Sequence, residues 1–386
     1  MAQAYIVETV RTAGGRRKGA LSGVHPADLG AVVLDALVDR TGIEGGAIED
    51  VIVGCVSQAG EQAFALGRNA VLASKLPDSV PAVTIDRQCG SSQQALHFAA
   101  QAVMSGTQDM VVAAGIESMT RVPMGSNFLL HRQAGIGEGP WSKAILERYN
   151  VAEFSQFVGA QMIADKYGFS REAMDAYAFE SHRRAARAIE AGAFVDEIVP
   201  VMTEGGPFAQ DEGVRFDASL EGIGSVKPII EGGTITAANA SQMTDGASAA
   251  LIVSEQALKD HGLTPIARVH SLAVTAGDPV IMLEEPIPAT RKALARAGMR
   301  LEDIDLYEVN EAFASVPMAW LKELGADPAK LNVNGGAIAL GHPLGASGTK
   351  LMATLTHALR ARGKRWGLQT MCEGGGIANV TIVEAL

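Results

Sequence analysis

Two cysteines lie in contexts that suit catalysis by a thiol. Cys89 lies between an apolar strand and a helix, within residues 86–92. A helix N-terminus favours negative charge, so we expect a lowered pKa and a nucleophilic thiol there, with a buried structural cysteine as the alternative. Cys372 follows another apolar strand and begins Cys-Glu-Gly-Gly-Gly, where glycine amides such as that of Gly374 could bind an oxyanion. Cys55 falls inside an apolar run and is expected in the core.

A histidine and an asparagine extend this set of candidate catalytic side chains. His342 stands among five glycines in residues 334–348, which allow close approach of the backbone to a ligand. Imidazole is the usual proton acceptor near neutral pH. Asn310 follows the apolar run 305–309, and the carboxyl end of a strand is a common place for a site. The alternatives are a histidine that only shapes a turn and an asparagine that only caps a helix.

Composition and missing motifs exclude several other functions. The net charge of −11 argues against broad nucleic-acid binding. The sequence has no GxGxxG, GxxxxGK[ST], HExxH or GxSxG motif, which removes support for nicotinamide, ATP, zinc-protease and serine-hydrolase chemistry. Three cysteines without a CxxC pair argue against a zinc site or a disulfide framework. Neither a signal peptide nor an 18-residue apolar run is found, so we expect no membrane span and a cytoplasmic location.

The elements that would position these residues alternate between apolar strands and amphipathic helices. We expect strands at 50–56, 81–85 and 109–115, and helices at 28–37, 91–104 and 171–191. This alternation predicts an α/β fold with sheets covered on both faces. The region 118–243 is richer in loops and is expected to be an insertion.

A weak internal repeat indicates two similar halves. Residues 48–53 resemble residues 301–306 at an offset of 253, and both segments follow a helix that ends in glycine. The same offset carries Cys89 onto His342. Each of these residues would then lie on a turn that precedes a helix and a strand. A chance likeness between α/β segments is the alternative.

Taken together, the motifs resemble those of the thiolase family. The matching segments are Cys-Gly-Ser from Cys89, Asn-Glu-Ala-Phe from Asn310, Gly-His-Pro-Leu-Gly-Ala-Ser-Gly around His342, and Cys-Glu-Gly-Gly-Gly from Cys372. The resemblance covers nearly the whole chain. It implies a five-layered αβαβα sandwich of two similar halves with an inserted loop domain. The expected boundaries are 1–117 plus 244–265 for the N-terminal half, 118–243 for the loop domain and 266–386 for the C-terminal half.

The resemblance also implies a reaction and a role for each residue. The reaction is reversible cleavage of a 3-ketoacyl-CoA by CoA, through an acyl group carried on Cys89. His342 would activate Cys89, and Cys372 would exchange a proton with the departing acetyl-CoA. His342 and a water held by Asn310 would bind the enolate oxyanion. The amides of Cys89 and Gly374 would bind the tetrahedral intermediate.

By the same resemblance, coenzyme A is a co-substrate, and neither a permanently bound cofactor nor a metal is expected. Arg215 matches an arginine that packs on the nucleotide, and Ser241 matches a serine on the pantetheine arm. Ala312 and Phe313 would line that channel. A homodimer or homotetramer is expected.

Departures from the family pattern bear on the substrate. Phe157 and Val158 stand where short-chain enzymes carry His-Met, and the loop with Met282 and Leu283 lacks the usual glycines. Residues 87–94 are similar to thiolases of steroid side chains. These features favour a degradative enzyme for longer or bulkier acyl groups. The alternatives are a short-chain acetyl-CoA acetyltransferase, a ketoacyl synthase, a cysteine hydrolase and a CoA-binding protein without catalysis, of which the synthase lacks a second catalytic cysteine.

Overall fold

The computed structural model describes residues 2–386. Their main feature is an 11-stranded sheet with the order β11-β12-β13-β10-β1-β9-β5-β3-β4, to which β2 (Gly15–Arg16) and β6 (Ile198–Val199) attach at β9 and β1. The strands on this path are β1 (Ala4–Thr12), β3 (Asp50–Gly54), β4 (Ala82–Ile85), β5 (Met110–Ser118), β9 (Thr244–Val253), β10 (Ala267–Ala276), β11 (Leu306–Val309), β12 (Trp366–Glu373) and β13 (Ile377–Ala385).

The sheet consists of two halves with the same strand order. In the first half β3 pairs in parallel with β4 and β5, while β9 pairs antiparallel with both β5 and β1. In the second half β11 pairs in parallel with β12, while β13 pairs antiparallel with both β12 and β10. A parallel bridge between Tyr307 and Leu331 stands where β4 stands in the first half. The halves meet where β1 pairs with β10 at only three residue positions.

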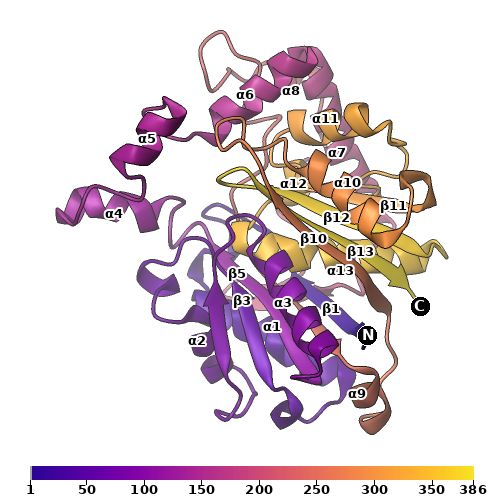
Figure 1. The fold of residues 1–386 in the computed structure, drawn as a ribbon. Coiled ribbons are helices and arrows are strands. Elements are labelled where there is room, and N and C mark those ends of the chain that lie inside the picture. The colour runs from indigo at the N-terminus through magenta and orange to yellow at the C-terminus, as the bar shows by residue number, and fades with distance from the viewer. Residues whose placement is uncertain (1) are drawn as a thin grey trace.

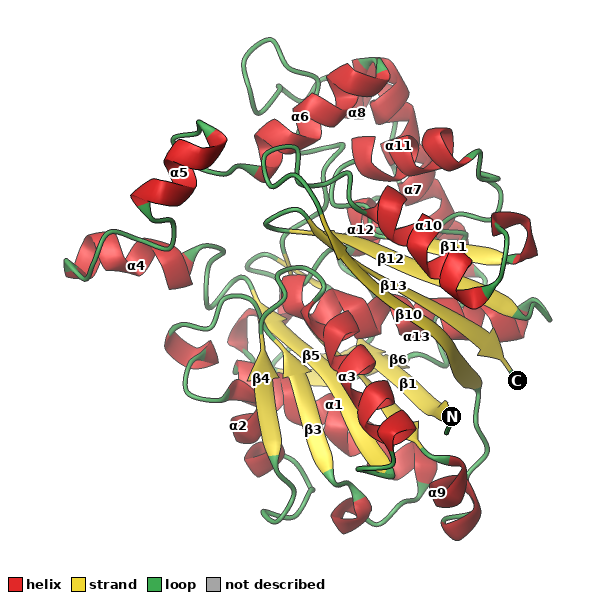
Figure 2. Ribbon diagram, in the orientation of Figure 1, coloured by secondary structure: helices red, strands yellow, loops and turns green. Residues whose placement is uncertain are grey.

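Helices cover both halves and also separate them (Figure 2). Side chains of α1 (Pro26–Thr41) and α2 (Leu66–Ala73) pack on one face of the first half. Those of α3 (Ser91–Ser105) and α13 (Ser347–Ala361) share one core with strands of both halves. On the far face of the second half lie α10 (Pro286–Ala297) and α11 (Ser315–Leu324). This arrangement confirms the predicted layers of helix, sheet, helices, sheet and helix.

The alternation of side chains along a strand explains why these sheets are buried on both faces. On β5, Val111 and Ala113 belong to the middle core, whereas Val112 and Ala114 belong to the outer core under α1. All nine residues of β5 are buried. The continuous apolar runs of the sequence are therefore strands between two layers of helices.

Local signals set the ends of the main helices as expected. In α7 (Arg171–Glu190) the Ser170 side chain accepts from the amide of Ala173, and α3 ends at Gly106, whose φ is 74°. Both helices match the predicted ranges within one residue. The smaller helices elsewhere are α9 (Glu255–Asp260) and α12 (Ala337–Leu340).

Residues 118–243 carry several short elements in addition to α7. Near the first half, α4 (Ser126–Ala134) and α5 (Lys143–Tyr149) extend away from the rest of the chain (Figure 1). The others are α6 (Gln156–Tyr167), α8 (Leu220–Gly224), and the two-stranded sheet of β7 (Val201–Thr203) and β8 (Gly206–Phe208). Within residues 2–386 we find no helix with the length and apolar composition needed to cross a membrane.

Candidate active site

Cys89 lies on a tight turn between β4 and α3. The Ser91 hydroxyl accepts from the amide of Arg87 (2.9 Å) and donates to the carbonyl of Gln88 (2.6 Å). Gln88 has a φ of 49°, in the left-handed region. Cys89 is partly buried and packs against a small cluster made of Val56, Met119 and Leu344. The turn thus holds the thiol close to the segment that follows His342.

The structure contradicts the expectation that the helix terminus acidifies Cys89. Burial, followed by the carboxyl of Glu373, raises the pKa of the Cys89 thiol to about 12. Glu117 and Asp86 add smaller contributions of the same sign. Removal of water and nearby carboxyl groups outweigh the helix dipole here. The Cys89 thiol is therefore neutral at rest and would need a base in order to act as a nucleophile.

His342 is buried and held by its own turn. The Gln242 carbonyl and the Thr244 hydroxyl accept from the His342 amide at 3.0 and 3.2 Å. On the ring, Nδ1 lies 2.5 Å from the Ser347 hydroxyl, and Nε2 lies 3.4 Å from the Asn310 side-chain nitrogen. Burial, with a smaller effect of Lys350, lowers the pKa of His342 to about 3, so the ring is neutral.

The hydrogen bonds around Ser347 indicate which ring nitrogen carries the proton. The Ser347 hydroxyl has one proton, which it donates to the carbonyl of Pro343 at 3.1 Å. Its oxygen must then accept from Nδ1–H of His342. Nε2 is left with a free electron pair. This nitrogen is the one that can take a proton from a substrate or from a thiol.

Asn310 and Glu311 follow β11, as the sequence predicted. Asn310 is 1 % exposed, and its side-chain oxygen accepts no hydrogen bond from the described residues. Because its nitrogen faces His342, this oxygen is an acceptor without a partner beside the ring. Glu311 points elsewhere and accepts from Tyr177, Ser181 and the Ile338 amide. It supports the turn before His342.

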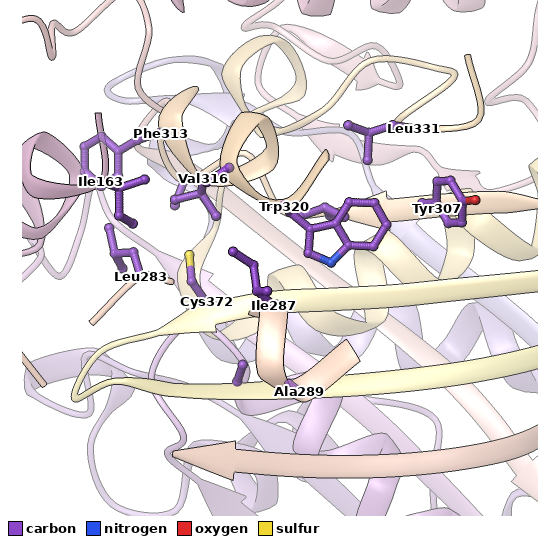
Figure 3. Close-up of a cluster of buried hydrophobic side chains, with 14 of the residues drawn as sticks. Ile163, Leu283, Ile287, Ala289, Tyr307, Phe313, Val316, Trp320, Leu331 and Cys372 are labelled. Atoms are coloured by element: carbon purple, nitrogen blue, oxygen red, sulfur yellow. The ribbon is translucent and has the colours of Figure 1, made fainter. Parts of the chain in front are cut away.

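Cys372 is buried and is the last residue but one of β12. Its thiol lies in an apolar cluster with Leu283, Ile287 and Phe313 (Figure 3). Burial, followed by the charges of Cys89 and Glu373, raises the pKa of Cys372 well above its ordinary value. A neutral thiol in such surroundings can donate a proton. The influence of Cys89 on this pKa shows that the two thiols lie within electrostatic range.

The two cysteine turns contact each other through glycines. A Cβ atom on Gly90 would lie 2.0 Å from the Glu373 carboxylate oxygen Oε1, and one on Gly374 would lie 2.9 Å from the Gln88 side chain. The turns of Cys89 and Cys372 can therefore approach this closely only because Gly90 and Gly374 have no side chain.

The helices behind the two halves also meet closely. A Cβ atom on Gly348 would lie 2.0 Å from the Gln93 amide nitrogen, and the Ser92 hydroxyl accepts from the Thr349 amide at 3.0 Å. This contact joins the first turns of α3 and α13. It brings the turn of Cys89 beside that of His342.

The residues that were predicted to bind CoA fall into two groups. Ser241 donates its amide to the Ala312 carbonyl at 2.9 Å, and Phe313 bridges to Ala240, so these residues adjoin Asn310. Arg215 is exposed on another loop, where its amide donates to His182. Among the described residues, no hydrogen bond or ion pair joins Arg215 to the first group.

Three of the four predicted substrate-pocket residues, Phe157, Met282 and Leu283, belong to or pack against the apolar cluster that contains Phe313. The ring of Phe157 packs edge-on against that of Phe313 at 5.6 Å between ring centres. Met282 and Leu283 are buried nearby, whereas Val158 is exposed. A cavity of about 430 Å³ borders Met282. Its lining mixes apolar and charged side chains, and it includes neither cysteine: Lys166, Tyr167, Asp278, Ile281, Met282, Glu284, Glu285, Ile287, Pro288, Arg291 and Glu323.

Two glutamines of the motif around Cys89 do not face a ligand. Gln93 and Gln94 are buried, and their side chains bind Thr381 (2.9 Å) and Asn379 (3.1 Å) of β13. They link the two halves of the chain. Any influence of Gln93 and Gln94 on the choice of substrate is therefore not exerted through direct contact with the acyl group.

Several buried residues that support the site were not found from the sequence. Both carboxylate oxygens of Glu117 accept hydrogen bonds, from the amides of Val56, Ser57 and Gly345 and from the Gln62 side chain. Ser347 and Glu373 were quoted only as parts of motifs. Nothing in their type or spacing indicates which of them packs against a thiol or an imidazole.

Comparisons with known proteins agree with this arrangement. Residues 4–256 match the family described as thiolase, N-terminal domain, and residues 263–385 match thiolase, C-terminal domain. Steroid 3-ketoacyl-CoA thiolase FadA6 of Mycobacterium tuberculosis is 55% identical over 100% of this chain and 95% of its own length. A 3-ketoacyl-CoA thiolase of Bacillus subtilis is 40% identical over 100% of both chains.

A solved structure agrees as well. The crystal structure of the Bacillus anthracis acetyl-CoA acetyltransferase superposes with a TM-score of 0.91, at 37% identity, over 100% of this chain and 99% of that one. The chain belongs to the thiolase family. It is an enzyme, an acyltransferase that acts on acyl-CoA thioesters.

Proposed function

We propose that this thiolase cleaves bulky 3-ketoacyl-CoA substrates in a degradative pathway, with steroid-derived acyl groups as the leading class. The observation that carries the cleavage chemistry is the contact between the turns of Cys89 and Cys372 beside a neutral His342. The 55% identity to a steroid 3-ketoacyl-CoA thiolase supports the substrate class. The aromatic Phe157 and the cavity beside Met282 are compatible with an acyl group larger than acetoacetyl.

The first half-reaction requires one base and one acid. The proton of the Cys89 thiol passes to Nε2 of His342 as the sulfur attacks the keto carbon of the substrate. The bond between Cα and Cβ of the substrate then breaks, and its electron pair stays on the acetyl-CoA carbon. The thiol of Cys372 donates a proton to that carbon, which releases acetyl-CoA and leaves the acyl group on Cys89. The raised pKa of Cys372 fits this role as an acid.

In the second half-reaction, the thiol of CoA gives its proton to the Cys372 thiolate and attacks the acyl group, and Cys89 leaves as it takes back the proton from Nε2 of His342. The amides of Cys89 and Gly374 would bind the oxyanion of the tetrahedral intermediate. The unpartnered Asn310 oxygen would hold the water that, with His342, binds the enolate oxyanion.

CoA enters this proposal as a co-substrate, with Ser241, Ala312 and Phe313 along its pantetheine arm and Arg215 at its nucleotide end. No other cofactor is needed for these steps. We also propose a homodimer or homotetramer that works in the cytoplasm.

The test is the CoA-dependent loss of 3-ketoacyl-CoA, measured with acetoacetyl, medium-chain, long-chain and ring-bearing substrates. Cys89→Ala should abolish cleavage of all of them, and mass spectrometry should find the acyl group on the Cys89 peptide of the wild type. Preferential cleavage of ring-bearing substrates supports the proposed class. Preference for acetoacetyl-CoA overturns the substrate class but not the chemistry, and hydrolysis without CoA overturns the chemistry.

A further inference from the structure

A buried lysine holds the backbone that leads into His342. Lys350 on α13 is 4 % exposed, and its Nζ donates to the carbonyl oxygens of Leu340 at 3.3 Å and Gly341 at 3.0 Å. Gly341 has a φ of 81°, in the left-handed region. Because these residues directly precede His342, the ammonium group fixes the peptide groups from which the imidazole projects.

Charged groups from several elements surround Lys350. Arg11 of β1 binds Asp211 with two hydrogen bonds, of 2.8 and 2.9 Å, and binds Glu197 at 2.5 Å, with all three side chains fully buried. Asp211, Glu197 and Glu308 of β11 favour the charged form of Lys350, whereas Arg11 opposes it. Burial raises the pKa of Glu308 well above its usual value. Lys350 and Arg11 thus share this buried region with the carboxyl groups of Asp211, Glu197 and Glu308.

This balance keeps the lysine charged beside the histidine. Burial and Arg11 lower the pKa of Lys350 to about 8, so the ammonium form prevails at neutral pH. The pKa of His342 is lowered first by burial and then by Lys350, which is the only charged group that acts on it to a resolved extent among the described residues. A charge so placed opposes protonation of the ring.

We propose that Lys350 is a positioning residue for His342, which holds the Leu340–Gly341 turn and keeps the imidazole in its neutral form. The inference rests on the proposed role of His342 as the base. Lys350 touches no reacting atom in this scheme. Its replacement should therefore change turnover and pH dependence more than the KM for CoA.

The decisive variants are Lys350→Met and Lys350→Arg, with Lys330→Met as a matched control. Lys330 also donates to two main-chain carbonyls, those of Ile304 (2.7 Å) and Glu302 (3.4 Å), but away from His342. Since misplacement of a catalytic group by about 1 Å can cost about 100-fold, we expect kcat of K350M to fall at least about tenfold. The acid limb of its pH profile should move upward from that of the wild type but stay below the ordinary histidine pKa of about 6.5, because burial still lowers the pKa of the ring.

Lys350→Arg keeps the charge and should retain the wild-type acid limb of the pH profile. Thermal melting and size-exclusion chromatography will show whether K350M folds. If it does not, the comparison of Lys350→Arg with Lys350→Gln tests the proposed role of Lys350. Gln can still donate a hydrogen bond but is uncharged, so its acid limb should move upward while that of the Arg variant stays. An unmoved acid limb in the Gln variant, or a moved one in the Arg variant, would overturn the inference.

A parallel His342→Ala variant separates the two proposals. If it keeps wild-type turnover, the proposed role of His342 fails. If it is inactive while K350M behaves like K330M in both kcat and pH profile, only the role of Lys350 fails.

Discussion

Replacement of Ser347 by alanine tests whether a single hydroxyl sets the protonation of the catalytic histidine. Ser347 is 2 % exposed, and its oxygen accepts from Nδ1–H of His342 at 2.5 Å. Without it, either a buried N–H loses its acceptor or the proton moves to Nε2 and blocks the base. An unsatisfied buried donor costs about 1–3 kcal/mol, which corresponds to about a 5- to 160-fold loss of turnover.

The assay is kcat at saturating CoA, together with the single-turnover rate at which Cys89 is acylated. Acylation should slow by the same factor as turnover, because the missing base acts in the first half-reaction. Ser254→Ala is a suitable control, since this buried serine also makes a hydrogen bond, to Asp109 at 2.6 Å, but lies at the start of α9. It should lower the melting temperature and leave kcat unchanged. Wild-type acylation in the Ser347→Ala variant would refute the assignment of the tautomer.

Three further changes test other parts of the site. Glu373→Gln should speed alkylation of Cys89 by iodoacetamide, because a nearby carboxyl no longer raises the pKa of that thiol. Burial raises the pKa of Glu373 from 4.5 to about 8, so between these pH values the folded state binds a proton that the unfolded state has lost. The same change should therefore stabilise the protein relative to wild type increasingly as the pH rises from about 4.5 to about 8. A melting-temperature difference between variant and wild type that does not vary with pH would contradict this. Glu117→Gln replaces an acceptor of two amide protons by a donor and should cost at least about 2 kcal/mol in urea unfolding. Gly348→Ala places a Cβ atom 2.0 Å from the Gln93 backbone and should cost about 1–3 kcal/mol or more, together with activity; a stable, active variant would show that the two helices can move apart.

Much of the fold could be predicted because its local signals agree with the packing. Continuous apolar runs predicted strands buried on both faces, and the helices expected at 91–104 and 171–191 match α3 and α7 within one residue. The internal repeat also indicated the two similar halves, but no single sequence offset aligns the halves along their whole length. Ile48 and Leu301 lie 253 residues apart, whereas α3 and α13 begin 256 residues apart, because a 3-10 turn (Leu344–Ala346) precedes α13. Cys89 and His342 thus lie on corresponding turns but not at equivalent positions.

The site was less predictable, because its electrostatics depend on which residues packing brings together. The position of Cys89 before a helix suggested a lowered pKa for its thiol. The carboxyl group that most raises this pKa, however, belongs to Glu373, 284 residues further along the chain. Gln93 and Gln94 belong to the segment 87–94, which suggested a steroid-type substrate because it resembles thiolases of steroid side chains. Their place on a buried face of α3 instead directs them to β13 of the other half.

In the proposed mechanism, catalysis needs both halves of the chain. The first half supplies Cys89, and the second supplies the histidine, the asparagine and the second cysteine. Their relative position is set by the contact of α3 with α13, where Gly348 lies on the Gln93 backbone. His97 of α3 and Thr381 of β13 add a buried hydrogen bond of 2.8 Å between the two halves. A change in this middle layer can therefore separate the two thiols without touching either, so activity should be lost before the outer layers unfold.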